Sequence, residues 1–196
     1  MNGADDWTFD IDSTALVVVG AQRGFDDERY GERNNPDADR HIQELLDAFR
    51  TADGVVVHVR HDAEERRSPL YPGRRGNDFR ETAEPARGES IVGTRRLNPF
   101  HRSTFEELLA DAGIDRLLLV GYDTDRLLTA TAVAAEDRGY APTVVSDAAV
   151  TFQRERDGTR YAAEQVHRVT LASLSETTAD VVEAATVLAR LETLDY

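Results

Sequence analysis

The sequence contains no cysteine, and its 23 Lys and Arg residues are all arginine. The first absence excludes a disulfide, a thiolate metal site and a thiol nucleophile. The absence of lysine excludes every mechanism that depends on a lysine amine. No apolar run approaches the roughly 20 residues that cross a bilayer, and the first residues are acidic, unlike those of a signal peptide. We therefore expect a cytoplasmic protein that does not enter a membrane.

The overall charge is strongly negative. Asp and Glu number 37, which gives a formal net charge of −14 in 196 residues. This composition resembles that of halophilic proteins, because a Debye length of roughly 3 Å at 1 M salt relieves repulsion between carboxylates. An acidic mimic of nucleic acid is the alternative, but the acids are dispersed and form no single block. We expect no nucleic-acid partner.

Apolar segments alternate with helical patterns along the chain, without an internal repeat or a dividing linker. Four short apolar runs have the length of buried parallel strands. A helix with Asn35 as N-cap and Pro36 in its first turn is predicted after the first strand, and a capping box of Ser103 and Glu106 begins another. We expect one α/β domain, residues 1–196, with strands at 14–19, 55–59, 117–120 and 142–146 and a weaker one at 90–92.

The chain must turn sharply at residues 121–125, between the strand at 117–120 and a helix predicted at 126–138. In an open parallel sheet, ligands bind at this kind of turn, because the loops diverge there and helix N-termini point into the crevice. We therefore expect any functional site of the chain to lie at residues 121–125.

Two acids in this turn affect ligand choice. Asp125 or Thr124 is expected to cap the following helix, which leaves Asp123 as the best remaining acid or base. The negative charge at the mouth of the crevice disfavours an anion unless Arg96 or Arg23 compensates. A small neutral or cationic ligand is therefore favoured.

Four short motifs occur at spacings that point to a known family. They are Gln22 with Phe25 after the first strand, the Gly-Tyr-Asp-Thr-Asp turn, Gly139-Tyr140, and Asp147-Ala148. Over about residues 15–182 the chain resembles the isochorismatase-like hydrolases, often called cysteine hydrolases. The resemblance implies a Rossmann-like three-layer sandwich with a mostly parallel sheet of about six strands, the sixth near residues 180–183.

The resemblance also implies where the catalytic groups of the family should stand. The family uses a nucleophilic cysteine, an aspartate that moves the proton and a lysine that holds the charged groups. The matching positions are Leu127, Gly20 and Thr94, and none has the required reactivity. We expect a catalytically degenerate member, a pseudoenzyme that serves as a ligand-binding or assembly and scaffold protein. The predicted ligand-binding residues are Gln22, Phe25, Arg96, Phe100, Asp123 and Thr124.

A hydrolase of altered mechanism is the alternative, so the sequence leaves open whether the chain is an enzyme. Asp123 would then activate water against a small amide, carbamoyl or enol-ether compound. A regulatory partner of an active paralogue is a third, weaker interpretation. No cofactor and no metal are expected: His61 and Asp62 are adjacent on an extended segment, so they point to opposite sides. His58 is predicted to be a core residue.

The segment at about 61–90 is irregular and rich in arginine. Residues 60–102 contain ten arginines and seven acids, so this part carries +3 and the remainder carries −17. Such an arm could attract an anionic ligand to the crevice or pair with the acidic surface of a neighbouring subunit. We favour the second interpretation, a homo-oligomer. Further on, a helix capped by Asp157 or Thr159 is predicted to run through Tyr161, Val166 and Val169 to about Leu174.

Overall fold

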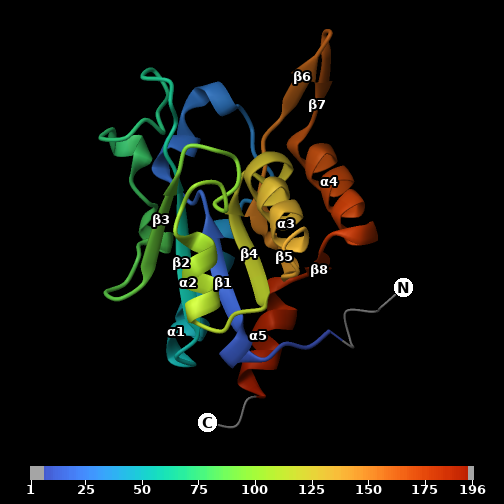
Figure 1. Cartoon of the computed structure of the whole chain (residues 1–196). Coiled ribbons are helices and arrows are strands. Elements are labelled where there is room, and N and C mark those ends of the chain that lie inside the picture. Colours follow the sequence, from blue (N-terminus) through green and yellow to red (C-terminus); the bar gives the residue numbers. More distant parts are fainter. Residues whose placement is uncertain (1–6, 194–196) are drawn as a thin grey trace.

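Six parallel strands form the centre of the computed structural model, which describes residues 7–193. Their order is β3-β2-β1-β4-β5-β8. The chain builds outward from β1 through β2 and β3, then returns to place β4 on the other side of β1 (Figure 1). Ligands of open parallel sheets bind at the carboxyl end of such a reversal. The strands are β1 (Thr14–Val19), β2 (Val55–His61), β3 (Ser90–Thr94), β4 (Arg116–Tyr122), β5 (Ala141–Val150) and β8 (Asp180–Val182).

The two central strands, β1 and β4, are the most deeply buried. Every residue of β1 is buried, and so is every residue of β4 after Arg116. Their apolar and β-branched side chains suit strands that are covered on both faces. Because Val19 pairs with Gly121 in the parallel register, the loops that follow the two strands begin side by side.

Helices cover both faces of the sheet. Figure 1 shows α2 and α3 in front of the sheet, α1 and α5 behind it, and α4 beside α3 near the edge strand β8. Helix α1 buries Ile42, Leu45, Leu46 and Phe49, which recur at helical spacing. This three-layer arrangement confirms the predicted α/β fold. The helices are α1 (Ala38–Thr51), α2 (Phe105–Asp111), α3 (Thr129–Glu136), α4 (Ala163–Thr177) and α5 (Ala184–Glu192).

The predicted start of α1 was wrong. The helix begins at Ala38, and Asn35 does not cap it. Asn35 has a φ of 43°, and its Nδ2 donates hydrogen bonds to the carbonyl oxygens of Ser146 at 2.8 Å and Ala149 at 2.7 Å. The side chain of Asn35, which the local sequence predicts as a helix cap, is therefore hydrogen-bonded to the distant strand β5 instead.

The predicted capping box of α2 is also absent. Thr104 precedes the helix and makes no side-chain cap. The hydroxyl oxygen of Ser103 accepts a hydrogen bond from the backbone N–H of Phe105 at 3.1 Å, whereas no bond returns from Glu106. The serine stabilises this end of the helix by itself.

A hairpin replaces the first turns of the helix that was predicted after β5, whereas the rest of that helix, through Val166 and Val169 to Leu174, is present as α4. Strands β6 (Arg154–Arg156) and β7 (Thr159–Tyr161) pair antiparallel and project from the upper end of the molecule in Figure 1. The connecting residues Asp157 and Gly158 have φ values of 52° and 76°. An Asp-Gly pair with both φ values positive is the preferred two-residue hairpin turn, so this dipeptide outweighed the helical spacing around it. The short strand β8 confirms the sixth strand.

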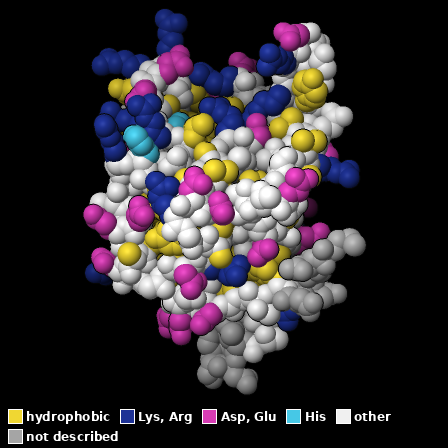
Figure 2. Space-filling view, turned by 45° about the vertical axis from the view of Figure 1, so that its right-hand side comes forward, with side chains coloured by type: hydrophobic (Ala, Val, Ile, Leu, Met, Phe, Trp, Pro, Cys, Tyr) yellow, Lys and Arg dark blue, Asp and Glu magenta, His cyan; other side chains and the backbone are white. Residues whose placement is uncertain are grey.

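The arginine-rich segment between β2 and β3 lies over the carboxyl ends of the strands. It contains only short 3-10 turns, at Arg75–Asn77 and Glu81–Ala83. Gln22 fastens it to the sheet, because its Nε2 donates to the carbonyl oxygens of His61 at 3.1 Å and Asn77 at 3.0 Å. Figure 2 shows arginine side chains gathered at this upper end, while acidic side chains predominate on the lower half of the visible face.

His58 lies in the core of β2, as predicted. Its Nε2 lies 2.8 Å from a carboxylate oxygen of Glu89, which also accepts a hydrogen bond from Arg50. Burial lowers the pKa of His58, so the ring is neutral at physiological pH. Within residues 7–193, no helix has the length and apolar content to cross a membrane.

Candidate functional site

A hollow of about 310 Å³ opens at the carboxyl ends of β1, β2 and β4. It lies where the strand order reverses, between the turn after β4, the loop after β1 and the start of the arginine-rich arm. Both apolar and ionisable side chains line it, which is the combination found in small-molecule sites. The apolar lining consists of Phe25, Tyr30, Ala63, Leu70, Leu97 and Leu127.

Gly20 and Leu127 meet beside this hollow. A Cβ added at Gly20 would lie 2.7 Å from the carbonyl oxygen of Tyr122, 3.0 Å from Cδ1 of Leu127 and 3.5 Å from the ring of Phe25. Gly20 also has a φ of 61°, which favours glycine. The backbone of β4 would have to move before any larger residue could occupy position 20.

Thr94 lies at the end of β3, opposite His61 in the strand register. Its hydroxyl oxygen accepts a hydrogen bond from the backbone N–H of Arg96 at 3.0 Å and lies 3.2 Å from the carbonyl oxygen of Asn98. The side chain therefore closes a turn. Thr94 itself does not line the hollow, although the next residue, Arg95, does.

Asp123 and Asp125 share one guanidinium group at the base of the hairpin. Nη2 of Arg154 donates to Asp123 at 2.7 Å and to Asp125 at 2.8 Å, and its Nε donates to Asp125 at 2.9 Å. The hydroxyl group of Thr151 contacts both carboxylates. Asp123 is only 1% exposed and lines the hollow. Neither acid caps the helix that follows, so the expected cap by Asp125 was wrong.

The two carboxyl groups differ in proton affinity. Burial raises the pKa of Asp123 to about 7, and the neighbouring Asp125 adds to the rise, because adjacent carboxylates resist ionising together. Burial alone would raise the pKa of Asp125 too, but hydrogen bonds to Asp123, Thr151 and Arg154 lower it. Near neutral pH the pair therefore holds about one negative charge or slightly more, and Arg154 compensates it. The sequence interpretation names Arg96 and Arg23 as the residues that could offset negative charge here and does not name Arg154.

Thr124 does not cap the helix either. The turn Thr124–Leu128 is π-helical and leads into α3. The hydroxyl group of Thr124 is buried 3.2 Å from Nδ1 of His167 on α4. Nε2 of His167 lies 3.0 Å from the carbonyl oxygen of Ser146. These contacts fix the turn against α4 and β5 and leave Thr124 outside the hollow.

His61 and Asp62 diverge, as adjacent residues of an extended segment should. The carboxylate of Asp62 accepts hydrogen bonds from Arg60 at 2.9 Å and Asn77 at 3.1 Å, whereas the ring of His61 lines the hollow. No group of three or more His, Asp or Glu side chains that could hold a metal ion occurs in the described part of the chain.

Comparison with known proteins was consistent with this architecture. Residues 14–186 match the isochorismatase domain. The chain belongs to the isochorismatase family. It is 29% identical over 175 residues to YrdC, an uncharacterised isochorismatase family protein of Bacillus subtilis, with 89% of this chain and 90% of YrdC covered.

Solved structures of the isochorismatase family superpose closely on this chain. One such protein from Chromobacterium violaceum gives a TM-score of 0.91 at 31% identity, covering 96% of this chain and 98% of its own. A cysteine hydrolase from Pseudomonas syringae gives a TM-score of 0.87 at 22% identity, covering 95% and 96%. The second likeness concerns the fold alone.

In this isochorismatase-family chain, the structure divides the predicted ligand-binding residues. Phe25 and Asp123 line the hollow. The ring of Phe100 instead packs on that of Phe105, with centroids 4.8 Å apart, and Gln22 is occupied by backbone groups of the arm. Four predicted residues lie outside the lining: Gln22, Thr124, Arg96 and Phe100.

Sequence reasoning missed several residues of this region. Arg126 lines the hollow directly after the acidic turn, where its position could have been read from the sequence. His61 and Tyr30 also line it. Arg154 holds the acid pair although it is 29 residues from Asp125, and the Asp-Gly hairpin turn nearby was the one signal available.

Proposed function

We propose that this isochorismatase-family protein binds a small ligand in the hollow and carries out no cysteine-dependent hydrolysis. The contact between Gly20 and Leu127 carries the proposal, since these positions match the aspartate and cysteine of the family. Leucine has no lone pair with which to attack a substrate, and glycine has no side chain with which to move a proton. No cysteine exists elsewhere in the chain to take the place of Leu127.

The surroundings of Leu127 support the same conclusion. A reactive thiolate needs a nearby positive charge to lower its pKa. Thr94 is uncharged and engaged in a turn, and the carboxyl group of Asp123 lies on the same hollow. The cations of the hollow, Arg95 and Arg126, are exposed, so solvent screens their effect on a thiolate. The hollow itself persists, with the mixture of apolar and polar groups that a small ligand needs.

Two measurements test this proposal. Purified protein is incubated with simple amides, carbamoyl compounds and enol ethers, and we expect no product above the buffer control. In the Leu127→Cys variant, which has a single thiol, the rate of alkylation against pH should give a thiol pKa at or above its usual value of about 8.5. A thiol pKa well below that value would contradict the proposed loss of the activating groups.

A hydrolase that uses Asp123 is the second candidate. The observation in its favour is that the pKa of this carboxyl is raised to about 7, where a group exchanges protons readily at neutral pH. This candidate predicts turnover by the wild-type protein that Asp123→Asn removes while the exposed control Asp111→Asn retains it. Equal activity in both variants would exclude Asp123 as the acid or base.

We also infer a role for the arginine-rich arm in self-association. Arg66, Arg67 and Arg75 are exposed and make no ion pair within 4 Å in the described part of the chain, while the chain outside residues 60–102 carries −17. These arginines would pair with the acidic surface of a second copy. Light scattering should show an oligomer at low salt that weakens as salt screens the charges. A monomer at every salt concentration would contradict this assembly.

A further inference from the structure

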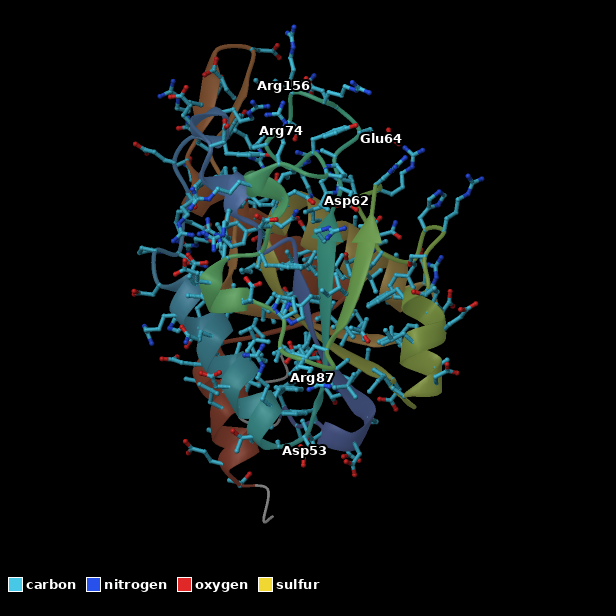
Figure 3. All side chains as sticks on the ribbon, turned by 90° about the vertical axis from the view of Figure 1, so that its left-hand side faces the viewer. Asp53, Asp62, Glu64, Arg74, Arg87 and Arg156 are labelled. Atoms are coloured by element: carbon cyan, nitrogen blue, oxygen red, sulfur yellow. The ribbon has the colours of Figure 1, made fainter. Side chains whose placement is uncertain are left out.

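The mouth of the hollow carries charges of both signs on separate segments. Glu64 and Glu65 come from the start of the arm, whereas Arg95 follows β3 and Arg126 follows β4. Figure 3 shows Glu64 above the end of β2, beyond Asp62. In the described part of the chain, no ion pair within 4 Å joins either glutamate to either arginine. Opposite charges therefore face the same space without neutralising each other.

The other charged groups of the lining already have strong partners. The guanidinium of Arg29 donates to Asp27 at 2.8 Å and to the carbonyl oxygen of Arg67 at 3.1 Å. Asp123 is held by Arg154 at 2.7 Å. By contrast, Arg126 has a side chain 54% exposed and comes no closer than 3.9 Å to Asp123. Among the described residues, the two glutamates and Arg95 have no ion pair within 4 Å, and Arg126 has only this long one, so these four groups are the charges that can engage a ligand.

A separate observation on the wall of the hollow also points to a ligand. Nδ1 of His61 is buried and has no hydrogen-bond partner among residues 7–193. A buried polar atom without a partner costs free energy, so a partner is expected for it. Four other such atoms occur among residues 7–193, but His61 is the one of these residues that lines the hollow. Beside it, Phe25, Leu97 and Leu127 offer an apolar surface. The hollow therefore combines unpaired charges, one unpaired polar atom and an apolar wall.

We propose that the ligand is a small zwitterion with an apolar body. Its carboxylate contacts Arg95 and Arg126, its ammonium group contacts Glu64 and Glu65, and its apolar part packs on Leu127. A ligand with one charge would leave either the two arginines or the two glutamates without a partner. A neutral ligand would leave all four without one. This inference rests on the proposed binding function, and it replaces the earlier preference for a neutral or cationic ligand.

Four probes with the same six-carbon chain separate the charge classes: norleucine, hexanoate, hexylamine and hexanol. Binding to the full-length protein is measured by calorimetry at low salt. We expect norleucine to bind at least roughly fivefold more tightly than each of the other three, the difference that a weak, exposed ion pair provides. Equal affinity for hexanol would overturn the zwitterion while leaving ligand binding intact. No binding of any probe would overturn both proposals.

Matched variants locate the two charges. Arg95→Gln should weaken the binding of norleucine and hexanoate but not that of hexylamine. The control is Arg96→Gln, because the neighbouring Arg96 is exposed but lies outside the lining. Glu64→Gln should weaken the binding of norleucine and hexylamine. The control is Glu107→Gln, on the exposed side of α2. Equal losses in a variant and its control would show general screening and contradict the proposed contacts.

Discussion

The side of the crevice next to β1 and the side next to β5 bury opposite kinds of side chain. Next to β1, Leu127 is 4% exposed, and its Cδ1 lies 3.0 Å from where a Cβ at Gly20 would be. Toward β5, Asp123 is 1% exposed and ionisable, and Arg154 holds it. Asp125, which shares this arginine, belongs to the same π-helical turn as Leu127, so one short segment supplies both environments.

The difference shows what each kind of burial requires. Burial of an apolar side chain stabilises the folded protein in proportion to the area removed from water. Such a side chain needs only neighbours of fitting shape. A buried carboxylate loses hydration and is tolerated only when it is protonated or has hydrogen-bonded partners. The charged side should therefore depend on one residue, Arg154, far more than the apolar side depends on any single contact.

The largest effect is expected from Arg154→Gln. This change leaves the buried Asp123 and the partly buried Asp125 with only the exposed Arg126, 3.9 Å from Asp123, as a counter-charge. We expect the substitution to lower the free energy of unfolding at pH 7.5 by about 3 kcal/mol. This value is at the low end for a buried pair, because the Arg154 side chain is 30% exposed. Urea unfolding measures the loss. The control is Arg156→Gln, whose exposed pair with Asp157 should contribute little. Equal losses in the two variants would contradict the claim that the charged side of the crevice depends on Arg154.

Leu127→Ala should have a smaller effect, about 2 kcal/mol. The substitution removes buried methyl groups, but the residue borders an open hollow, so little closed cavity remains and the cost falls at the low end of the range for such changes. Leu97 lines the same hollow but is 41% exposed, so Leu97→Ala should lower the free energy of unfolding much less. A loss for Leu127→Ala larger than that for Arg154→Gln would reverse our ranking of the two sides.

The smallest effect is a change in pH dependence, tested with Asp123→Asn. Because the folded-state pKa of Asp123 is raised to about 7, the folded protein binds more protons than the unfolded chain between about pH 4 and 7, and this residue makes stability fall as pH rises. The variant lacks that decline. Its stability relative to wild type should increase by roughly 1.3 kcal/mol between pH 5 and 6. Parallel stability curves would show that Asp123 does not titrate in this range.

Much of the fold could be predicted from local patterns. The β-branched run that became β1 has one plausible role, and the apolar spacing of Ile42, Leu45 and Phe49 fixes the inner face of α1. Local signals failed where a distant partner competed for the same side chain. Asn35 bonds to β5 instead of capping α1. The start of α4 is a different case, because the local Asp157-Gly158 turn forms a hairpin in place of the first turns predicted for that helix.

The candidate site was only partly predictable, for a related reason. Phe25 and Asp123 line the hollow because strand ends of a parallel sheet lie at one edge, which a sequence can indicate. Phe100 and Arg96 occur at motif positions, yet their side chains lie outside the hollow. Motif position identifies a backbone location, whereas the packing around it decides the direction of the side chain.

The sequence by itself determined the parallel α/β architecture, the family and the absence of thiol and amine chemistry, because periodicity and residue identity are properties of the chain alone. Tertiary structure alone decided that Arg154 compensates the acid pair and that Glu64 faces the same hollow as Arg95. The hydrogen bonds of Arg154 join residues far apart in the sequence: Asp125 is 29 positions away and Asp123 is 31. Such partners are chosen by the burial of charge in the folded protein, which no local pattern records.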